Sequence, residues 1–347
     1  MTTIYDKLLA YGNSDAYPFH MPGHKRQITD FVNPFQIDIT EIDGFDNLHH
    51  PEGILKEAQE RAAALYGSRS TYFLVNGSTC GILSAVSALV RPGGEIILAR
   101  NCHKASYHAC YLGDLVIHSL YPQWEPKFGI NGGILPEDVE KLLKDYPKTQ
   151  AVLITSPTYD GAVSDVKRIA EICHAHGIPL IVDEAHGAHL GFCPYFPESA
   201  LKLGADVVIQ SFHKTLPSFT QTAVLHVSKS ARVDEDRIRR FLGIYQSSSP
   251  SYIFMAAMDR CVEFLKNEGK ERFEAFAARL EGFYAFIRGL ERIRIPGYEI
   301  RGDYGIFDFD RSKILLVPDA HGGEWLAEEL RKKDHLELEM EAGGYGL

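Results

Sequence analysis

The sequence predicts an α/β protein whose larger part is a seven-stranded, mostly parallel sheet. Seven short apolar runs lie between residues 72 and 227, helical stripes separate several of them, and reactive side chains follow their ends. Most runs lack polar alternation, which is typical of strands buried on both faces. Strands that alternate with helices form doubly wound sheets. The expected strands are Tyr72–Val75, Glu95–Ala99, Leu115–Leu120, Ala151–Thr155, Ile178–Asp183, Asp206–Gln210 and Thr222–Val227.

Apolar residues at helical spacing mark the helices between these strands. In residues 164–177 an i, i+3, i+4, i+7 stripe begins at Val166, with Ser164 as the expected N-cap and Gly177 as the C-terminal stop. A similar stripe occupies Pro136–Tyr146, behind a proline suited to a first helical turn. Only the eleven residues Ser211–Gln221 join the last two strands. A parallel crossover needs about a dozen residues, so we expect the final strand to be antiparallel.

Beyond residue 228 the pattern changes to longer helices and short strands. The expected helices are Arg232–Leu242, Tyr252–Asn267 and Glu271–Leu290, and the expected strands are Ile293–Ile300, Ser312–Val317 and Leu336–Met340 with Glu341. A chain that stops one strand into a new sheet leaves an unpaired apolar edge. We therefore expect an N-terminal segment (residues 1–50), a large domain (51–260) and an incomplete α+β small domain (261–347).

Composition excludes several classes of protein. The chain has 347 residues, 45% hydrophobic and 24% charged, with a net charge of −10. These values are ordinary for a globular enzyme, and the acidic charge argues against a nucleic-acid or anionic-membrane partner. The six cysteines have no zinc spacing, so we expect reduced, buried thiols and no metal. Neither a signal peptide nor a membrane-length apolar run is found, which predicts a cytoplasmic protein.

An amine and a carboxylate follow two of the expected strands. Asp183 ends one apolar run, and Lys214 follows the next, after Ser211-Phe212-His213. If the two runs are neighbouring parallel strands, both side chains lie at the crevice where open α/β sheets bind ligands. A lysine that forms a Schiff base and an acid that keeps a pyridine nitrogen protonated suit pyridoxal phosphate (PLP).

Two other strand ends carry residues of the same kind. Asn76-Gly77-Ser78-Thr79 leads from a strand into an apolar helix, where backbone N–H groups and the helix dipole could hold a phosphate. Plain helix capping by a Ser or Thr is the alternative. His103 follows the second strand and could stack on a planar cofactor. Its alternative is a histidine bonded to solvent or backbone.

The string Asp183-Glu184-Ala185-His186 has other readings. It also occurs in helicases, but the phosphate loop is missing here. His186 with His189 could suggest a metal site, although the three-residue spacing offers no third ligand. Asp183 could also be a buried, hydrogen-bonded structural residue.

Together these pieces resemble the ornithine/lysine/arginine decarboxylase family of PLP fold-type I enzymes, whose large domain is aspartate-aminotransferase-like. The resemblance is greatest to the short members, which lack an N-terminal wing domain and share the histidine at position 186, where the large members have tryptophan. The matching segments occur in family order: Phe19–Lys25, Asn76–Thr79, Arg100–Lys104, Ser156–Gly161, Asp183–Gly187, Ser211–Lys214 and Ser247–Tyr252.

The resemblance implies a role for each matching residue. Lys214 would form the Schiff base, Asp183 would bind the pyridine nitrogen and His103 would stack on the ring. His213 would lie beside the Schiff base and His186 near the ring edge. The phosphate would be held by Ser78, Thr79 and Ser211, with Ser247 from a second subunit. The segment His20–Lys25 would lie by the active site of a homodimer.

The implied reaction is PLP-dependent α-decarboxylation of lysine, arginine or ornithine, with His213 or Lys214 returning a proton to the α-carbon. Asp43, Asp46 and Glu52 are candidates for an acidic wall around a cationic substrate, or they form an ordinary solvated loop. The competing functions are an aminotransferase or carbon–carbon lyase on the same fold, and a catalytically silent remnant.

Overall fold

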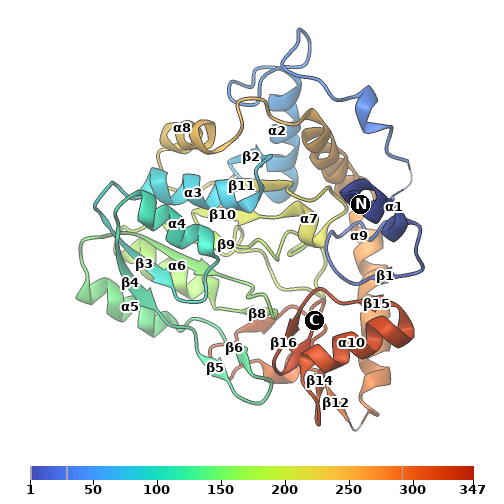
Figure 1. Cartoon of the computed structure of the whole chain (residues 1–347). Coiled ribbons are helices and arrows are strands. Elements are labelled where there is room, and N and C mark those ends of the chain that lie inside the picture. The colour runs from blue at the N-terminus through green and yellow to red at the C-terminus, as the bar shows by residue number, and fades with distance from the viewer. Residues whose placement is uncertain (1, 29, 291) are drawn as a thin grey trace.

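The computed structural model describes residues 2–28, 30–290 and 292–347, and it contains the expected seven-stranded sheet (Figure 1). All seven expected strands are present and adjoin one another in a single sheet. In spatial order they are β2 (Ser70–Leu74), β11 (Ala223–Val227), β10 (Val207–Gln210), β9 (Leu180–Asp183), β7 (Thr149–Thr155), β3 (Glu95–Ala99) and β4 (Val116–Leu120).

The directions of the strands confirm the mostly parallel sheet. β10, β9, β7, β3 and β4 are mutually parallel, whereas β11 is antiparallel to both β10 and β2. The short connection before β11 therefore turns the chain back, as its length predicts. Ile209 of β10 pairs with Asp183 of β9, so the two strands that precede the amine and the carboxylate are neighbours.

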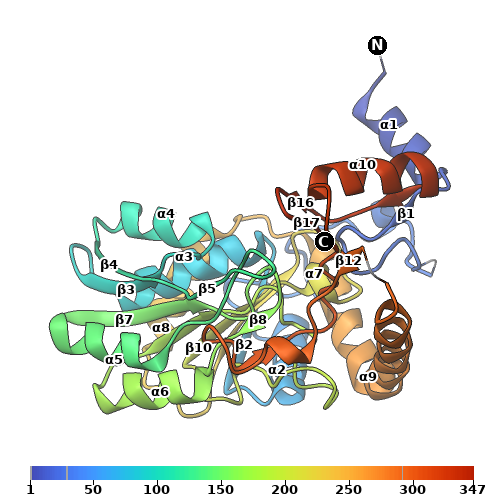
Figure 2. The same cartoon turned by 90° about the horizontal axis from the view of Figure 1, so that it is seen from below.

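Helices cover both faces of the sheet (Figures 1 and 2). Each face buries its own apolar cluster, which explains why the central strands lack polar alternation. One face is covered by α2 (Ile54–Tyr66), α5 (Pro136–Asp145), α6 (Val166–Ala175) and the start of α9 (Tyr252–Ile287). The other is covered by α3 (Gly77–Leu89), α4 (Lys104–Leu112) and α8 (Glu235–Tyr245).

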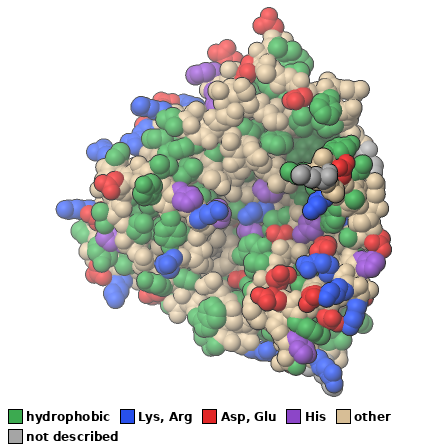
Figure 3. All heavy atoms as spheres, viewed as in Figure 1, with side chains coloured by type: hydrophobic (Ala, Val, Ile, Leu, Met, Phe, Trp, Pro, Cys, Tyr) green, Lys and Arg blue, Asp and Glu red, His purple; other side chains and the backbone are tan. Residues whose placement is uncertain are grey.

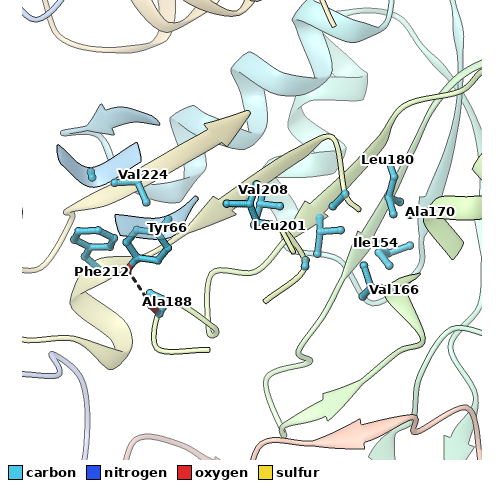
Figure 4. Close-up of a cluster of buried hydrophobic side chains, with 14 of the residues drawn as sticks. Tyr66, Ile154, Val166, Ala170, Leu180, Ala188, Leu201, Val208, Phe212 and Val224 are labelled. Atoms are coloured by element: carbon cyan, nitrogen blue, oxygen red, sulfur yellow. Dashed lines mark hydrogen bonds between the residues drawn. The ribbon is translucent and has the colours of Figure 1, made fainter. Parts of the chain in front are cut away.

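A buried aromatic cluster anchors α7 (Phe212–Thr215), the short helix after β10 (Figure 4). The ring of Phe212 is fully buried and stacks on Tyr66, with centroids 5.9 Å apart. The hydroxyl of Tyr66 donates to the carbonyl of Ala188 at 3.0 Å. Burial of a side chain of this size contributes about 1.5–3 kcal/mol, so the residue next to His213 holds the helix firmly on the sheet.

The two ends of the chain meet beside α10 (Gly323–Asp334) (Figures 1 and 2). β15 (Leu336–Glu337) pairs in parallel with β1 (Tyr17–Pro18). The prediction of an unpaired C-terminal edge is therefore wrong, because a segment from the other end of the chain supplies the partner. The division at residues 50 and 260 stays a prediction, and α9 runs across the second boundary.

Three local expectations are corrected. Asp165, not Ser164, is the N-cap of α6, and its side chain accepts from the N–H of Arg168 at 3.0 Å. The two helices expected on either side of Gly269 form the single helix α9, because one glycine costs a helix only about 1 kcal/mol. The strand expected over 293–300 shortens to β12 (Ile293–Arg294) and a 3₁₀ turn, η2 (Tyr298–Ile300), while 312–317 yields only β14 (Val317–Pro318).

The remaining elements are short and lie around the sheet and the C-terminal part. They are α1 (Ile4–Gly12), η1 (Pro34–Gln36), β5 (Trp124–Glu125), β6 (Ile130–Asn131), β8 (Ala162–Val163), β13 (Asp308–Phe309), β16 (Glu341–Ala342) and β17 (Tyr345–Gly346). β13 pairs with β8, which joins the C-terminal part to the loop after β7. All six cysteines are buried and unpaired. None of the helices described combines the length and apolarity needed to cross a membrane.

Candidate active site

The carboxyl edge of the sheet brings Lys214 and Asp183 into one site. Lys214 lies in α7 directly after β10, and Asp183 is the last residue of the neighbouring β9. The Asp183 carboxylate is buried and accepts from the N–H of Ala185 at 3.1 Å. Burial raises the pKa of Asp183, while the charge of Lys214, the Ala185 N–H and His103 oppose that rise. Burial also favours the uncharged form of Lys214 and so lowers the pKa of its amine.

His186 lies between two lysines. Its Nε2 is 2.9 Å from Nζ of Lys214, and its Nδ1 is 3.2 Å from Nζ of Lys313. Burial, reinforced by the neighbouring Lys313 and Lys214, holds the pKa of His186 well below its ordinary value. Sequence reasoning missed Lys313. The only signal was a lysine directly before the apolar run that begins at Ile314.

Backbone N–H groups are presented at the turn where β2 leads into α3. Asn76 is the N-cap but its side chain does not cap the helix, so the alternative of plain capping by Ser78 or Thr79 is wrong. Gly77 has φ +72°, a left-handed conformation that favours glycine at this turn. Ser78 is half-buried and Thr79 exposed, both in the first turn, where N–H groups and the helix dipole attract anions.

Ser211 is a buried polar residue between β10 and α7. Its hydroxyl oxygen has no hydrogen-bond partner among the residues that the structure describes. An unpaired buried hydroxyl costs about 1–3 kcal/mol, which favours a ligand that would bond to it. Thr215, one turn further along α7, carries a second unpaired hydroxyl.

His103 caps α4 and keeps an exposed ring. Its Nδ1 accepts from the N–H of Ala105 at 3.2 Å, so the imidazole is bonded to backbone, as one alternative expected. Burial lowers the pKa of His103, although the carboxylate of Asp183 raises it. The imidazole of His103 is planar and neutral, and its Nδ1 is already hydrogen-bonded, so the ring is compatible with stacking on a planar group.

The segment His20–Lys25 crosses the site within the same chain. The N–H of Gly23 donates to the carbonyl of His213 at 2.7 Å. The Nζ of Lys25 donates to the carbonyl of Phe19 at 2.8 Å, and burial lowers the pKa of Lys25 to about 8. His213 itself donates from Nδ1 to the carbonyl of Thr222 at 2.9 Å, and burial lowers its pKa.

A groove of about 1510 Å³ opens from Lys214 along α9 and the N-terminal segment. Figure 3 shows histidine, lysine and arginine side chains gathered around a hollow on this face. Lys313 and Glu339 also line the groove, and Glu339 accepts from the hydroxyl of Tyr159 at 3.0 Å. The acidic residues in its lining are Asp30, Glu263, Glu268 and Glu339.

The acidic wall expected from Asp43, Asp46 and Glu52 is therefore corrected, because none of the three lines the groove. Asp43 and Glu52 are exposed. The carboxylate of Asp46 instead accepts from the N–H of Asn47 and from four backbone N–H groups at the start of α2, among them Gly53 at 2.8 Å and Glu52 at 2.9 Å. Asp46 is a helix cap.

Ser247 lies beside the turn between β2 and α3 of its own chain. Its N–H donates to Oδ1 of Asn76 at 3.1 Å, and its carbonyl lies 2.8 Å from Nε2 of His49. His189, considered as a metal ligand, pairs with Asp310 at 3.2 Å. In the described parts of the chain no group of three or more His, Cys, Asp or Glu side chains could hold a metal ion.

This architecture is that of the PLP fold-type I enzymes, with Lys214 at the carboxyl edge of the sheet. The chain belongs to the Orn/Lys/Arg decarboxylase family, whose major-domain model matches residues 2–294. An arginine decarboxylase of Halalkalibacterium halodurans is 32% identical over 348 residues, covering 98% of this chain and 71% of the relative.

Another relative and a solved structure are also similar to this chain. The uncharacterized protein YaaO of Bacillus subtilis is 41% identical over 265 residues, or 74% of this chain. The chain covers 55% of that relative, about half its length. The crystal structure of a Francisella novicida lysine decarboxylase has the same fold, with a TM-score of 0.76 at 20% identity over 100% of this chain and 56% of that one.

Proposed function

We propose that the chain binds PLP and decarboxylates a basic amino acid to an amine and CO2. The observation that carries the proposal is Lys214, a half-buried amine that follows β10 and adjoins the buried carboxylate of Asp183 at the end of β9. Family membership and the relative named arginine decarboxylase support the reaction type.

The residues present fit the proposed cofactor. Ser211 offers an unpaired buried hydroxyl, and the first turn of α3 offers N–H groups that the side chain of its N-cap leaves free. Ser78, Thr79 and Ser211 would hold the phosphate, with Ser247 beside them through Asn76. Asp183 would hold the proton of the pyridine nitrogen. When bound, PLP supplies an electron sink for the pair of electrons left by departing CO2.

The chain's own groups would bind and orient the substrate and move one proton. Lys214 supplies the amine that His186 holds at 2.9 Å. His213 commits Nδ1–H to the carbonyl of Thr222, which leaves Nε2 as its exchangeable position. Either His213 or Lys214 would return the proton to the α-carbon. Glu339 and Glu263 of the groove would attract the cationic side chain of the substrate, since Asp30 and Glu268 are paired with Arg260 and Arg272.

The test is an assay of product and cofactor on the purified chain. With lysine, arginine or ornithine labelled in the carboxyl group, we expect labelled CO2 and the matching amine from one of the three. Lys214→Ala should lose both the product and the visible absorbance of Schiff-base-bound PLP. A keto acid in place of the amine would establish an aminotransferase, and carbon–carbon cleavage would establish a lyase. A chain that binds no PLP would be the silent remnant.

We also propose a homodimer as the working unit. The support is a row of exposed apolar residues on α1, where Ile4 is 80% and Leu8 is 64% exposed. Apolar surface of this kind is common at interfaces between subunits. Sedimentation equilibrium should give twice the chain's mass, and an active monomer would contradict the proposal.

A further inference from the structure

Two lysines contact opposite nitrogens of one buried imidazole. Lys214 approaches Nε2 of His186, and Lys313 approaches Nδ1. Both His186 and Lys313 are buried. Within the described parts of the chain Lys313 forms no ion pair, and its amine donates to the imidazole. A buried lysine is costly even where carboxyl groups lie near it, so its position calls for a role.

Proton counting limits how these three groups can bond. An ammonium only donates, and a neutral imidazole has one donor and one acceptor nitrogen. If Lys313 is the ammonium, Nδ1 accepts and the imidazole proton is on Nε2. That N–H then points at Lys214, which must accept through a lone pair and hence be a free amine. The reverse arrangement would place the ammonium on Lys214 and the free amine on Lys313.

The surrounding charges favour the ammonium on Lys313. Three carboxyl groups face Lys313, namely Asp310, Glu339 and Asp160. Only Asp183 and Glu339 face Lys214, which also experiences the repulsion of Lys313. Two ammonium groups on one imidazole would leave a donor facing a donor. Two further neighbours, His103 and His213, have pKa values lowered by burial, so neither adds a positive charge near neutral pH. Lys25 also faces Lys313, and the two amines repel each other, but burial lowers the pKa of Lys25 to about 8 and Glu339 attracts both amines.

We propose that Lys313 is a positioning residue that fixes the Nε2–H tautomer of His186 and thereby keeps the Lys214 amine unprotonated. The consequence for chemistry is direct, because an amine attacks an aldehyde carbon through the lone pair that an ammonium lacks. The identity of that aldehyde rests on the proposed function. The protonation state of the Lys214 amine is independent of the proposed function.

Trace acetylation measures this state without cofactor. The chain free of PLP is labelled with a trace of acetic anhydride between about pH 5 and 10, and mass spectrometry compares Lys214 with the exposed Lys148. In Lys313→Met the repulsion is lost, so the labelling midpoint of Lys214 should rise by about one pH unit. Labelling near neutral pH should fall about tenfold. Lys313→Arg keeps a cationic donor and should keep the midpoint of the unaltered chain.

An unchanged midpoint in Lys313→Met, or an equal rise in Lys313→Arg, would overturn the inference. If circular dichroism shows that the Met variant does not fold, His186→Leu serves instead. It removes the donor to Lys214 and should also raise the midpoint, and no rise would again overturn the inference.

A second experiment measures the binding of PLP by its absorbance over the same pH range. The pH midpoints of PLP binding should rank the variants in the same order as the midpoints of acetylation. The two experiments separate the claims. If the labelling midpoints of Lys214 shift as expected but the chain does not bind PLP, only the proposed function is contradicted. If the labelling midpoints do not shift as expected, the positioning role of Lys313 is contradicted, whether or not PLP binds.

Discussion

The backbone of Gly23 rests directly on the backbone of Leu216, with no room for a side chain between them. A Cβ atom on Gly23 would lie 2.6 Å from the carbonyl oxygen of Leu216 and 2.9 Å from its nitrogen. Leu216 ends α7, so this contact holds the N-terminal segment on the helix that carries Lys214.

Gly23→Ala should therefore weaken the packing of the N-terminal segment against α7. Neither backbone can yield, and overpacking of this kind costs about 1–3 kcal/mol. We expect the affinity for PLP, measured by absorbance titration, to fall about tenfold or more, with a lower Tm. Gly12→Ala is the matched control, because a Cβ there meets nothing within 4 Å. Equal affinity in the two variants would show that the contact does not support the site.

Ser211→Ala should change stability and cofactor binding in opposite directions. The hydroxyl of Ser211 is buried and unpaired among the described residues, so its removal from the cofactor-free chain should stabilise it by about 1 kcal/mol. If the hydroxyl bonds the phosphate of PLP, the same change should weaken PLP binding about tenfold. Thermal unfolding and absorbance titration give the two readouts.

Ser84→Ala controls for the loss of a hydroxyl. Ser84 is also buried and unpaired in the described structure, but it lies deeper in α3. It should give a similar gain in stability with no change in PLP affinity. A weakened affinity in Ser84→Ala comparable to that in Ser211→Ala would remove the argument for a phosphate contact.

Asp46→Ala should destabilise α2 without affecting substrate affinity. The loss of a side-chain cap costs about 0.5–2 kcal/mol, whereas a substrate wall would show itself in KM. Asp43→Ala, at an exposed position, is the control. Urea unfolding and steady-state kinetics distinguish the two roles, and a raised KM at unchanged stability would restore the substrate wall.

The effect of Asp46 should depend on pH. Partial burial alone would raise the pKa of Asp46, but the backbone N–H donors outweigh it and the net shift is downward. A carboxyl group with a lowered pKa in the folded state stabilises above its unfolded pKa of about 3.9. The stability lost in Asp46→Ala should therefore be constant near neutral pH. It should shrink as the pH falls through the folded pKa, and a pH-independent difference would contradict the ionic cap.

Gly269→Ala should stabilise the protein by about 0.5–1 kcal/mol. Gly269 lies inside α9, and an added Cβ would make ordinary contacts with Leu265 at 3.6 and 3.7 Å. Gly67→Ala is the opposite case, because Gly67 ends α2 with φ +76° and should lose stability. A loss of stability in Gly269→Ala would favour the two separate helices first expected.

The sequence by itself determined the sheet and the meeting of Lys214 and Asp183 at one of its edges. Strands buried on both faces leave continuous apolar runs, and short connections limit strand direction, so both are local signals. Lys214 and Asp183 could be placed together because neighbouring parallel strands end at the same edge. Residue patterns of this kind need no knowledge of distant contacts.

Only the tertiary structure decided the rest of the site. Lys313 meets His186 across 127 residues of sequence, and β15 finds its partner in β1 at the other end of the chain. Asp46 proved to be a helix cap because the chain curls back over the start of α2. In each case the deciding contact joins segments whose own sequences carry no sign of their partner, so only the packing of the whole chain specifies it.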